Sequence, residues 1–370
     1  MTNSLISAKM VQEKIGVLAK RISERLGRPV RLMEVCGTHT VAIFRSGIRQ
    51  LLPSEVELVS GPGCPVCVTH DEYMDKAIAY AQMPDTIITT FGDMLKVPGT
   101  SSSLEAEKSK GADIRIIYSP LDSIEIAKAN PTKKVIFLAV GFETTAPTAA
   151  GLVLAAKAEG LTNLFLLSSH KLVAPIMRVL LDDPTTKVDG FILPGHVAVV
   201  VGSREFDFLA ADYHLPGVVA GFEGENILLA IYRLLKMLDE EKPAVENIYP
   251  SVVATCGNPK ALEILYQVYE PAAMLWRGMG EIPASGLRMK AEFQAFDIEQ
   301  VLPITTDTPA VKSSPCRCGE VLKGQIKPLE CKMFGKVCTP EHALGPCMVS
   351  VEGTCASWYK YGQATFNFGG

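Results

Sequence analysis

Short apolar runs alternate with longer amphipathic stretches through the first two thirds of the chain. Runs rich in apolar and β-branched residues occur near 31–35, 55–60, 86–91, 113–118, 135–140, 163–168, 189–193 and 217–221, and stretches with helical spacing separate most of them. This alternation is typical of parallel sheets whose faces are covered by helices. The pattern therefore predicts an α/β fold with open parallel sheets.

The eight predicted strands fall into two series that resemble each other. Residues about 105 positions apart match at the ends of four strands: 35–40 with 140–145, Cys64 with Ser169, Phe91 with His196, and Tyr118 with Phe222. Such a constant separation indicates a duplication. We therefore expect two similar Rossmann-like domains, at residues 28–130 and 131–240. An amphipathic helix in 1–27 precedes them, and an α+β, loop-rich C-terminal region occupies 241–370.

Two cysteine-bearing turns follow the first two predicted strands. Cys36 comes directly after the first strand, and Cys64 and Cys67 form a Cys-x-x-Cys pair after the second. Ligands bind at the carboxyl ends of strands in open α/β sheets, so the three thiols are expected to share one crevice. The Gly-Pro-Gly sequence before Cys64 suits a tight turn that a ligand can approach closely. The pair has the spacing of a dithiol/disulfide couple, although a structural zinc pair and three buried apolar cysteines are alternatives.

The second series places further polar residues at the corresponding strand ends. Glu143, Thr144 and His196 lie there, and a pseudo-twofold arrangement would bring them to the same cleft as Thr38 and His39. We expect Glu143 to carry a proton or to orient a reacting group. Taken singly, Thr144 is also explained as a helix cap, and an isolated histidine is more often structural than a ligand. Their common placement favours a functional cleft between the two domains.

Six cysteines cluster near the end of the chain, in a segment rich in Gly, Pro and Lys: Cys316, Cys318, Cys331, Cys338, Cys347 and Cys355. A segment of this composition has too small a hydrophobic core to fold without a disulfide or a bound metal, and disulfides are disfavoured in a reducing compartment. A zinc knuckle requires a wider spacing than Cys316-x-Cys318, whereas the wider spacings suit an iron–sulfur cluster. One consistent ligand set is Cys316, Cys331, Cys338 and Cys355, with Cys318 and Cys347 as alternatives.

Composition narrows the classes of function. Apolar residues make up 48% of the 370 positions, which is enough for sizeable cores. The net charge is −4 and no block of Lys and Arg is present, which argues against nucleic-acid binding. No apolar run approaches the ~18 residues of a membrane span. Residues 1–25 show helical spacing among charges rather than a signal peptide, so we expect a cytoplasmic protein. Its ten cysteines then indicate metal or redox chemistry.

The combination of motifs resembles the HypD family of [NiFe]-hydrogenase maturation proteins. The resemblance rests on segments 34–40, 61–67, 141–145 and 193–197 and on the terminal cysteine set, and it covers essentially the whole chain in order. It implies two similar α/β domains and a third region with a [4Fe–4S] cluster. It also implies a monomer that works in complexes with a small HypC-type chaperone, on which an Fe(CN)2CO group is assembled, and with a HypE-type protein that supplies cyanide.

Residue roles follow from the resemblance by position. Cys36 would bind the iron under assembly, and Cys64 and Cys67 would form the thiol pair, with His39 and the backbone N–H groups of a helix start raising thiolate character. The supporting residues would be Thr38, His39, Glu143, Thr144, His196 and Glu352, and the cluster ligands would be Cys316, Cys331, Cys338 and Cys355. Val351 stands where the family commonly has serine before Glu352, a departure that leaves the thiols untouched.

Two other classes of function explain part of the pattern. A thiol–disulfide oxidoreductase with an iron–sulfur relay would use Cys64 and Cys67, but it would need neither Cys36 nor a duplicated cleft. A zinc-stabilised interaction protein would bind the metal through the three thiols and His39 or His70. A maturation scaffold with redox activity, rather than a stand-alone enzyme, accounts for all of these features together.

Overall fold

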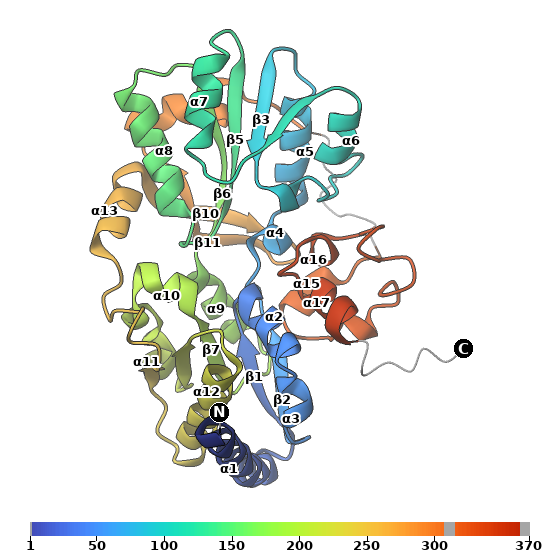
Figure 1. The fold of residues 1–370 in the computed structure, drawn as a ribbon, viewed down its shortest axis with the longest axis vertical. Coiled ribbons are helices and arrows are strands. Elements are labelled where there is room, and N and C mark those ends of the chain that lie inside the picture. Colours follow the sequence, from blue (N-terminus) through green and yellow to red (C-terminus); the bar gives the residue numbers. More distant parts are fainter. Residues whose placement is uncertain (1, 307–314, 363–370) are drawn as a thin grey trace.

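Two parallel sheets form the centre of the molecule (Figure 1). The computed structural model describes residues 2–306 and 315–362. A five-stranded sheet has the order β2-β1-β7-β8-β9, and a four-stranded sheet has the order β4-β3-β5-β6. The strands are β1 (Val30–Glu34), β2 (Val56–Ser60), β3 (Thr86–Thr90), β4 (Asp113–Ile116), β5 (Lys134–Gly141), β6 (Leu164–His170), β7 (Gly190–Pro194), β8 (Gly217–Ala220) and β9 (Val245–Asn247). The predicted α/β class with Rossmann-like parallel sheets is confirmed.

The sheets do not follow the predicted domain boundaries. The chain leaves the five-stranded sheet after β2, builds the whole four-stranded sheet from β3 to β6, and returns at β7. Each sheet therefore contains strands from both 28–130 and 131–240, and β9 extends the first sheet past residue 240. A local hydrophobic pattern identifies a strand but not its neighbours in the sheet, so contiguous domains were the wrong inference from a correct strand count.

The strand order agrees with the predicted duplication. When each strand is replaced by its counterpart four places along the series, β2-β1-β7-β8 becomes β6-β5-β3-β4. This is the second sheet read from its other edge. The first two strands of each half thus pair with the last two strands of the other half, and the halves are exchanged between the sheets.

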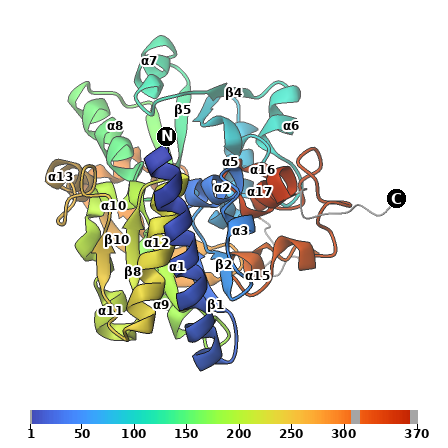
Figure 2. The ribbon, with the colours of Figure 1, turned by 60° about the horizontal axis from the view of Figure 1, so that its bottom comes forward.

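Helices cover the faces of both sheets. α1 lies beside α12 on the five-stranded sheet (Figure 2), where Ile15 and Ile22 are buried. No helix within the described part of the chain combines the length and the apolar character that crossing a membrane requires. The helices up to the C-terminal region are α1 (Thr2–Leu26), α2 (Gly37–Arg45), α3 (Ile48–Leu51), α4 (Pro65–Val68), α5 (Asp71–Ala81), α6 (Leu104–Ser109), α7 (Asp122–Ala129), α8 (Ala146–Ala158), α9 (Val173–Asp182), α10 (Gly195–Val201), α11 (Phe208–Tyr213) and α12 (Gly224–Asp239).

The C-terminal region combines a hairpin with short helices and loops. After α13 (Pro259–Val268), β10 (Tyr269–Trp276) and β11 (Gly280–Met289) pair antiparallel, and Tyr269 and Trp276 are fully buried. The last helices, α14 (Ile298–Val301), α15 (Cys318–Leu322), α16 (Pro346–Val349) and α17 (Thr354–Tyr361), are short. α16 contacts α4, and α17 contacts α2, so this region lies against both cysteine-bearing turns (Figure 1).

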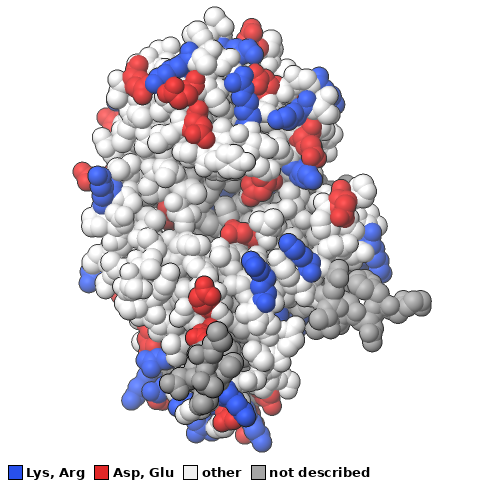
Figure 3. Space-filling view, viewed as in Figure 1, with Lys and Arg blue, Asp and Glu red and all other residues white. Residues whose placement is uncertain are grey.

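Charged side chains of both signs occur on the face of the molecule that Figure 3 shows. On the face shown in Figure 3, acidic and basic residues are interspersed rather than gathered by sign. This distribution leaves the strand ends, rather than the charged surface, as the place to look for a functional site.

Candidate functional site

Cys36 lies where β1 ends and α2 begins. Its backbone is extended (φ −148°, ψ 120°), and it occupies the N-cap position of α2. Burial raises the pKa of the Cys36 thiol to about 12, whereas the backbone N–H groups of His39 and Thr38 lower it. The start of the helix therefore offers hydrogen-bond donors to a sulfur anion, while the buried surroundings keep an unligated thiol protonated.

A buried carboxyl group fixes the backbone of this turn. Glu34, the last residue of β1, accepts hydrogen bonds from the hydroxyl of Thr40 (2.7 Å) and from the backbone N–H of Cys36 (3.3 Å). Burial raises the pKa of Glu34 to about 7, and the hydroxyls of Ser60 and Thr40 oppose that shift. The carboxyl group thus ties the end of the strand to the helix that follows Cys36.

The second cysteine-bearing turn lies directly against the first. Gly37 donates its backbone N–H to the carbonyl of Gly63 (3.0 Å). A Cβ atom at Gly63 would lie 2.2 Å from the backbone nitrogen of Cys36, so no residue larger than glycine fits there without a shift. The two turns are therefore adjacent, as their positions at neighbouring strand ends predict, because β1 pairs with β2.

The ring of His39 is directed at Gly221 and Phe222. Its Nε2 lies 3.1 Å from the carbonyl oxygen of Gly221, and its centroid lies 4.6 Å from that of Phe222. Burial lowers the pKa of His39 to about 4, so the imidazole is neutral at physiological pH. The neutral ring therefore adds no positive charge beside Cys36, and the backbone N–H group of His39 is the part of this residue that favours a thiolate there.

Glu352 connects the C-terminal region to the Cys36 turn. Its Oε1 accepts a hydrogen bond from the hydroxyl of Thr38 (2.8 Å). A Cβ atom at Gly37 would lie 2.5 Å from the Cβ of Glu352, which explains the glycine after the cysteine. The charge of Glu352 also contributes to the raised pKa of Cys36. Thr38 and Glu352, both expected at the site from the resemblance, lie beside the cysteine.

Two further strand ends face the same carboxylate. His196, at the start of α10, stacks on Phe222 with a centroid distance of 4.1 Å, and its pKa is lowered by burial and raised by Glu352. Asp93 belongs to η1 (Gly92–Met94) after β3, and its pKa is raised by burial and also by Glu352. Residues from both sheets and from the C-terminal region thus converge around Glu352.

A groove opens beside Thr38 and Glu352. Its volume is about 590 Å³. Most of its wall is apolar, and Arg45 and Lys360 add positive charge. The lining residues are Thr38, Val41, Arg45, Pro340, Met348, Val349, Val351, Glu352, Ala356, Tyr359, Lys360 and Tyr361. The groove is large enough to receive a segment of another protein next to Cys36.

The Cys-x-x-Cys pair is buried and its thiols are free. Cys64 caps α4, and its sulfur accepts a hydrogen bond from the backbone N–H of Cys67 (3.3 Å). Cys64 is 3% exposed and Cys67 is 0% exposed. Burial raises the pKa of Cys67 well above its usual value. A short helix begun by a cysteine therefore holds both sulfurs on the same turn.

Cys347 joins the thiol pair to the C-terminal cysteines. Its thiol neighbours those of Cys67 and Cys355, both of which act on its pKa. The Cys67 sulfur also lies 3.9 Å from the carbonyl oxygen of Pro346 at the start of α16. A continuous series of thiols therefore runs from Cys64 through Cys67 and Cys347 to Cys355.

The other C-terminal cysteines gather around the end of this series. Cys316 and Cys318 are hydrogen-bonded to each other. The pKa of Cys338 is raised by burial and by the neighbouring Cys355 and Cys331. The four cysteines of the expected cluster set therefore lie within electrostatic range of one another or of Cys347.

The surroundings of these sulfurs fit a group bound by thiolates. Leu344 directs its backbone N–H to the sulfur of Cys338 (3.4 Å), a hydrogen bond that favours the anionic form. A Cβ atom at Gly345 would lie 2.7 Å from the sulfur of Cys316, so any larger residue at this position would clash with that sulfur. The donor set, Cys316, Cys331, Cys338 and Cys355, therefore suits the all-thiolate coordination of a [4Fe–4S] cluster.

The two histidines of the zinc alternative have other partners. His39 contacts Gly221 and Phe222, and Nδ1 of His70 accepts the backbone N–H of Glu72 at the start of α5 (3.3 Å). Across residues 2–306 and 315–362, no three Cys, His, Asp or Glu side chains converge closely enough to bind a single metal ion. These contacts give the histidines structural roles.

Glu143 and Thr144 are not brought to the Cys36 turn. The Oε1 atom of Glu143 accepts the backbone N–H of Val173 at the start of α9 (2.9 Å), and burial raises the pKa of Glu143 to about 7. Its electrostatic neighbours include Glu205 and Tyr266. Thr144 is exposed before α8. Glu143 therefore joins the end of β5 to the start of α9, a contact that strand-end placement alone could not reveal.

Some site residues were not identified from the sequence. Glu34 ends a largely buried strand, and a charged residue at such a position signals a buried hydrogen-bonded role. Arg277 lowers the pKa of Cys318, and it forms an ion pair with Asp71. These pairings join segments far apart in the sequence, so they depend on the tertiary fold.

Comparison with known proteins identifies close relatives. The family model for HypD, described as "Hydrogenase formation hypA family", matches residues 9–362. The hydrogenase maturation factor HypD of Rhodobacter capsulatus is 44% identical over 361 residues, which cover 96% of each chain. That of Escherichia coli (strain K12) is 43% identical over 356 residues, covering 95% of this chain and 94% of the relative. That of Cupriavidus necator is 40% identical over 370 residues, covering 96% and 97%.

Proposed function

Because the chain belongs to the HypD family of hydrogenase maturation factors, we propose that it is a redox-active scaffold for assembling the Fe(CN)2CO group of a [NiFe]-hydrogenase. In this proposal the iron group is the cargo, held between Cys36 and a small HypC-type chaperone. A HypE-type protein supplies the cyanide. The work takes place in the reducing cytoplasm, where all ten cysteines stay available as thiols or metal ligands.

Cys36 is the iron ligand of this chain. Iron that carries cyanide and CO is soft and electron-rich, and a thiolate suits it better than a carboxylate does. The sulfur sits at the N-terminus of α2, where the N–H groups of Thr38 and His39 compensate its negative charge. Cys36 is also separate from the Cys-x-x-Cys pair, so ligation there leaves that pair free for redox chemistry.

Thr38, His196 and Glu352 support the cargo without binding its iron. The Glu352 carboxylate holds the hydroxyl of Thr38 and lies in the electrostatic range of His196 and Asp93. Such a carboxylate can take or return a proton as ligands are attached, and the neighbouring imidazole can share it. The C-terminal region thereby contributes one polar side chain directly beside Cys36.

Cys64 and Cys67 hold the electrons that this chemistry needs. Oxidation of the two thiols forms one sulfur–sulfur bond and releases two protons and two electrons, and reduction reverses this. A [4Fe–4S] cluster bound by Cys316, Cys331, Cys338 and Cys355 would supply electrons singly. The thiol of Cys347 lies between the two groups of cysteines, as a neighbour of both Cys67 and Cys355.

The groove beside Thr38 and Glu352 is the docking surface for the chaperone. Its largely apolar wall suits an apolar segment, and Arg45 and Lys360 suit a carboxylate on the partner. Docking there would bring a partner's own iron ligand close to Cys36. The single observation that carries the proposal is therefore the placement of Cys36 between this groove and the thiol series.

Replacement of Cys36 tests the proposal directly. Cys36→Ala should leave folding and the C-terminal iron unchanged, because alanine also fits the end of a strand. It should abolish the cyanide and CO infrared bands of the anaerobically purified complex, and also hydrogenase maturation in cells. Cys256→Ala is the matched control, since Cys256 is exposed. Bands of normal intensity in the Cys36→Ala complex would show that the iron is held elsewhere.

The oxidoreductase alternative is less well supported. Its substrate disulfide would have to reach Cys64 or Cys67, which are almost fully buried under α16 and the hairpin. The thiol pair could exchange electrons with a partner protein that stays bound to this chain. A disulfide on a freely diffusing protein could reach the pair only after the C-terminal region had moved.

A further inference from the structure

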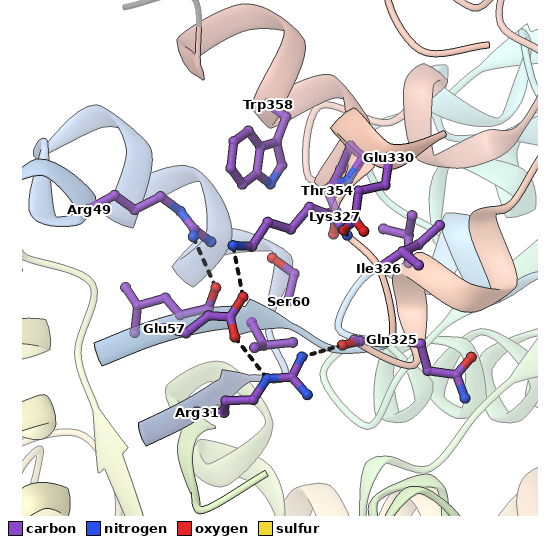
Figure 4. Close-up of a pocket in the computed structure, with 15 residues that line it drawn as sticks. Arg31, Arg49, Glu57, Ser60, Gln325, Ile326, Lys327, Glu330, Thr354 and Trp358 are labelled. Carbon is purple, nitrogen blue, oxygen red and sulfur yellow. Dashed lines mark hydrogen bonds and ion pairs between the residues drawn. The ribbon is translucent and has the colours of Figure 1, made fainter. Parts of the chain in front are cut away.

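A second, smaller pocket lies where the C-terminal region meets the edge of the five-stranded sheet. One wall comes from β1, α3 and the edge strand β2, and the other from α15, the loop that follows it, and α17 (Figure 4). Its volume is about 40 Å³. This pocket is distinct from the groove beside Thr38 and Glu352, and neither the iron ligand nor the thiol pair lines it.

Positive charge predominates in this pocket. Arg31, Arg49 and Lys327 line it together with the carboxylates of Glu57 and Glu330. Glu57 is already paired with both Arg31 (3.0 Å) and Lys327 (2.8 Å). The Oε2 atom of Glu330 accepts the backbone N–H of Lys327 (2.7 Å). Arg31 and Lys327 therefore share one carboxylate, and no carboxylate forms an ion pair with Arg49 among the described residues.

Arg49 is the least compensated of these groups. Its NH1 donates to the carbonyl of Leu58 (3.0 Å), but its buried Nε has no hydrogen-bond partner within the described residues. Burial lowers the pKa of Arg49 to about 10, opposed by the more distant charges of Glu34 and Glu57. A buried guanidinium with a spare N–H is costly unless an acceptor reaches it.

The head groups converge on one place. In Figure 4 the side chains of Arg49 and Lys327 point toward one another from opposite sides, with Trp358 above them. The Trp358 ring lies 5.1 Å from the guanidinium carbon of Arg49, and the Phe44 ring lies 4.7 Å from it. The two rings hold the planar guanidinium in a fixed orientation. Like charges that converge in this way repel each other, and the Glu57 carboxylate, which Lys327 shares with Arg31, offsets this repulsion only in part.

We propose that this pocket binds a small oxyanion of the size of inorganic phosphate, held by Arg49 and Lys327. A water molecule needs roughly 10–15 Å³ of such volume, so the pocket has room for about three waters or for the oxygens of one small oxyanion. The guanidinium fork of Arg49 matches two oxygens of a tetrahedral or carboxylate anion. The lysine provides a further charge from the opposite wall.

The anion would join two parts of the molecule that carry different functions. Arg49 belongs to α3, which follows the helix of Cys36, whereas Lys327 belongs to the loop between the cysteines of the C-terminal region. Trp358 lies on α17, the helix that also carries Cys355. Anion binding would therefore stabilise the docking of the C-terminal region against the Cys36 half. This role does not depend on the proposed iron assembly.

Binding is tested with inorganic phosphate and the full-length, anaerobically purified protein. Phosphate should raise the melting temperature in a saturable way beyond potassium chloride of equal ionic strength. Lys327→Met should weaken the apparent affinity about tenfold or more, as expected for the loss of a charge-assisted hydrogen bond. Arg49→Met should abolish the effect. Formate and bicarbonate, titrated in parallel, show whether a smaller oxyanion occupies the same site better.

Lys336→Met is the matched control, because Lys336 is an exposed lysine of the same region outside the pocket. It should bind phosphate as the parent protein does. If Arg49→Met does not fold, Lys327→Met alone decides the question, since its ammonium group is half exposed. Absence of saturable binding would overturn the proposal. So would equal loss in Lys327→Met and Lys336→Met, which would mean an adventitious ion only.

Discussion

Replacement of Lys171 by methionine should make the protein more stable at neutral pH. Lys171 is 1% exposed, and its Nζ donates a hydrogen bond to the hydroxyl of Ser169 (2.8 Å). No carboxylate forms an ion pair with it in the part of the chain that the structure describes. Burial alone lowers the pKa of Lys171 from 10.5 to about 7. The native state therefore holds an amine that the unfolded chain would protonate.

The size of the effect follows from that shift. One pKa unit corresponds to about 1.4 kcal/mol, so holding Lys171 in the native state at pH 7 costs on the order of 4 kcal/mol. Methionine removes this cost but leaves the hydroxyl of Ser169 without its donor, which costs about 1–2 kcal/mol. A net stabilisation of roughly 2–3 kcal/mol at pH 7 is expected.

The pH dependence provides the sharper measurement. Between pH 7 and about 10 the unfolded chain binds more protons at this position than the native protein does, so the free energy of unfolding of the parent protein rises with pH as the cost of burying Lys171 disappears. The contribution is lost as pH falls from 10.5 toward 7. The difference in free energy of unfolding between Lys171→Met and the parent should therefore be largest near pH 7 and should shrink toward pH 10.

Urea unfolding under anaerobic conditions at several pH values measures this difference. Lys260→Met, which removes an exposed lysine, is the control and should change stability little at any pH. A Lys171→Met protein that is less stable at pH 7 and keeps the pH slope of the parent would refute the reasoning. Such a result would mean that Lys171 is charged and has a partner in the native state.

Three further predictions concern the cysteines. The number of free thiols per chain should fall by two after mild oxidation, because Cys64 and Cys67 form a disulfide. This change should vanish in Cys64→Ser and persist in the control Cys256→Ser. Zinc retained at one equivalent in both the oxidised and the reduced protein would contradict the redox pair. Cys331→Ala and Cys338→Ala should each remove most of the iron and sulfide, near four of each per chain in the parent; full occupancy in Cys355→Ala together with loss in Cys347→Ala would show that the ligand set is wrong. Gly345→Ala should lower iron retention, since its Cβ would lie 2.7 Å from the sulfur of Cys316, whereas Gly151→Ala, where nothing lies within 4 Å, should retain iron as the parent does.

The local pattern of residues was sufficient for the strands, the repeat and the two cysteine-bearing turns. Apolar runs specify strands because buried strands need continuous apolar sides. The glycines at positions 37 and 63 mark turns where backbones approach closely, and the structure shows that each is in contact with the site. Adjacent positions of Cys36 and Cys64 follow from parallel pairing of the first two strands.

Only the tertiary structure decided which strands share a sheet and which polar groups meet. The return of the chain to the first sheet at β7 brings His196 within the electrostatic range of Glu352, while Glu143 turns to cap α9. The hydrogen bond between Thr38 and Glu352 spans more than 300 residues of sequence. Strand identity depends on local burial, which the order of residues reveals. Which strands become neighbours and which side chains pair depends on contacts between distant segments, and no local pattern encodes the free energy of those contacts.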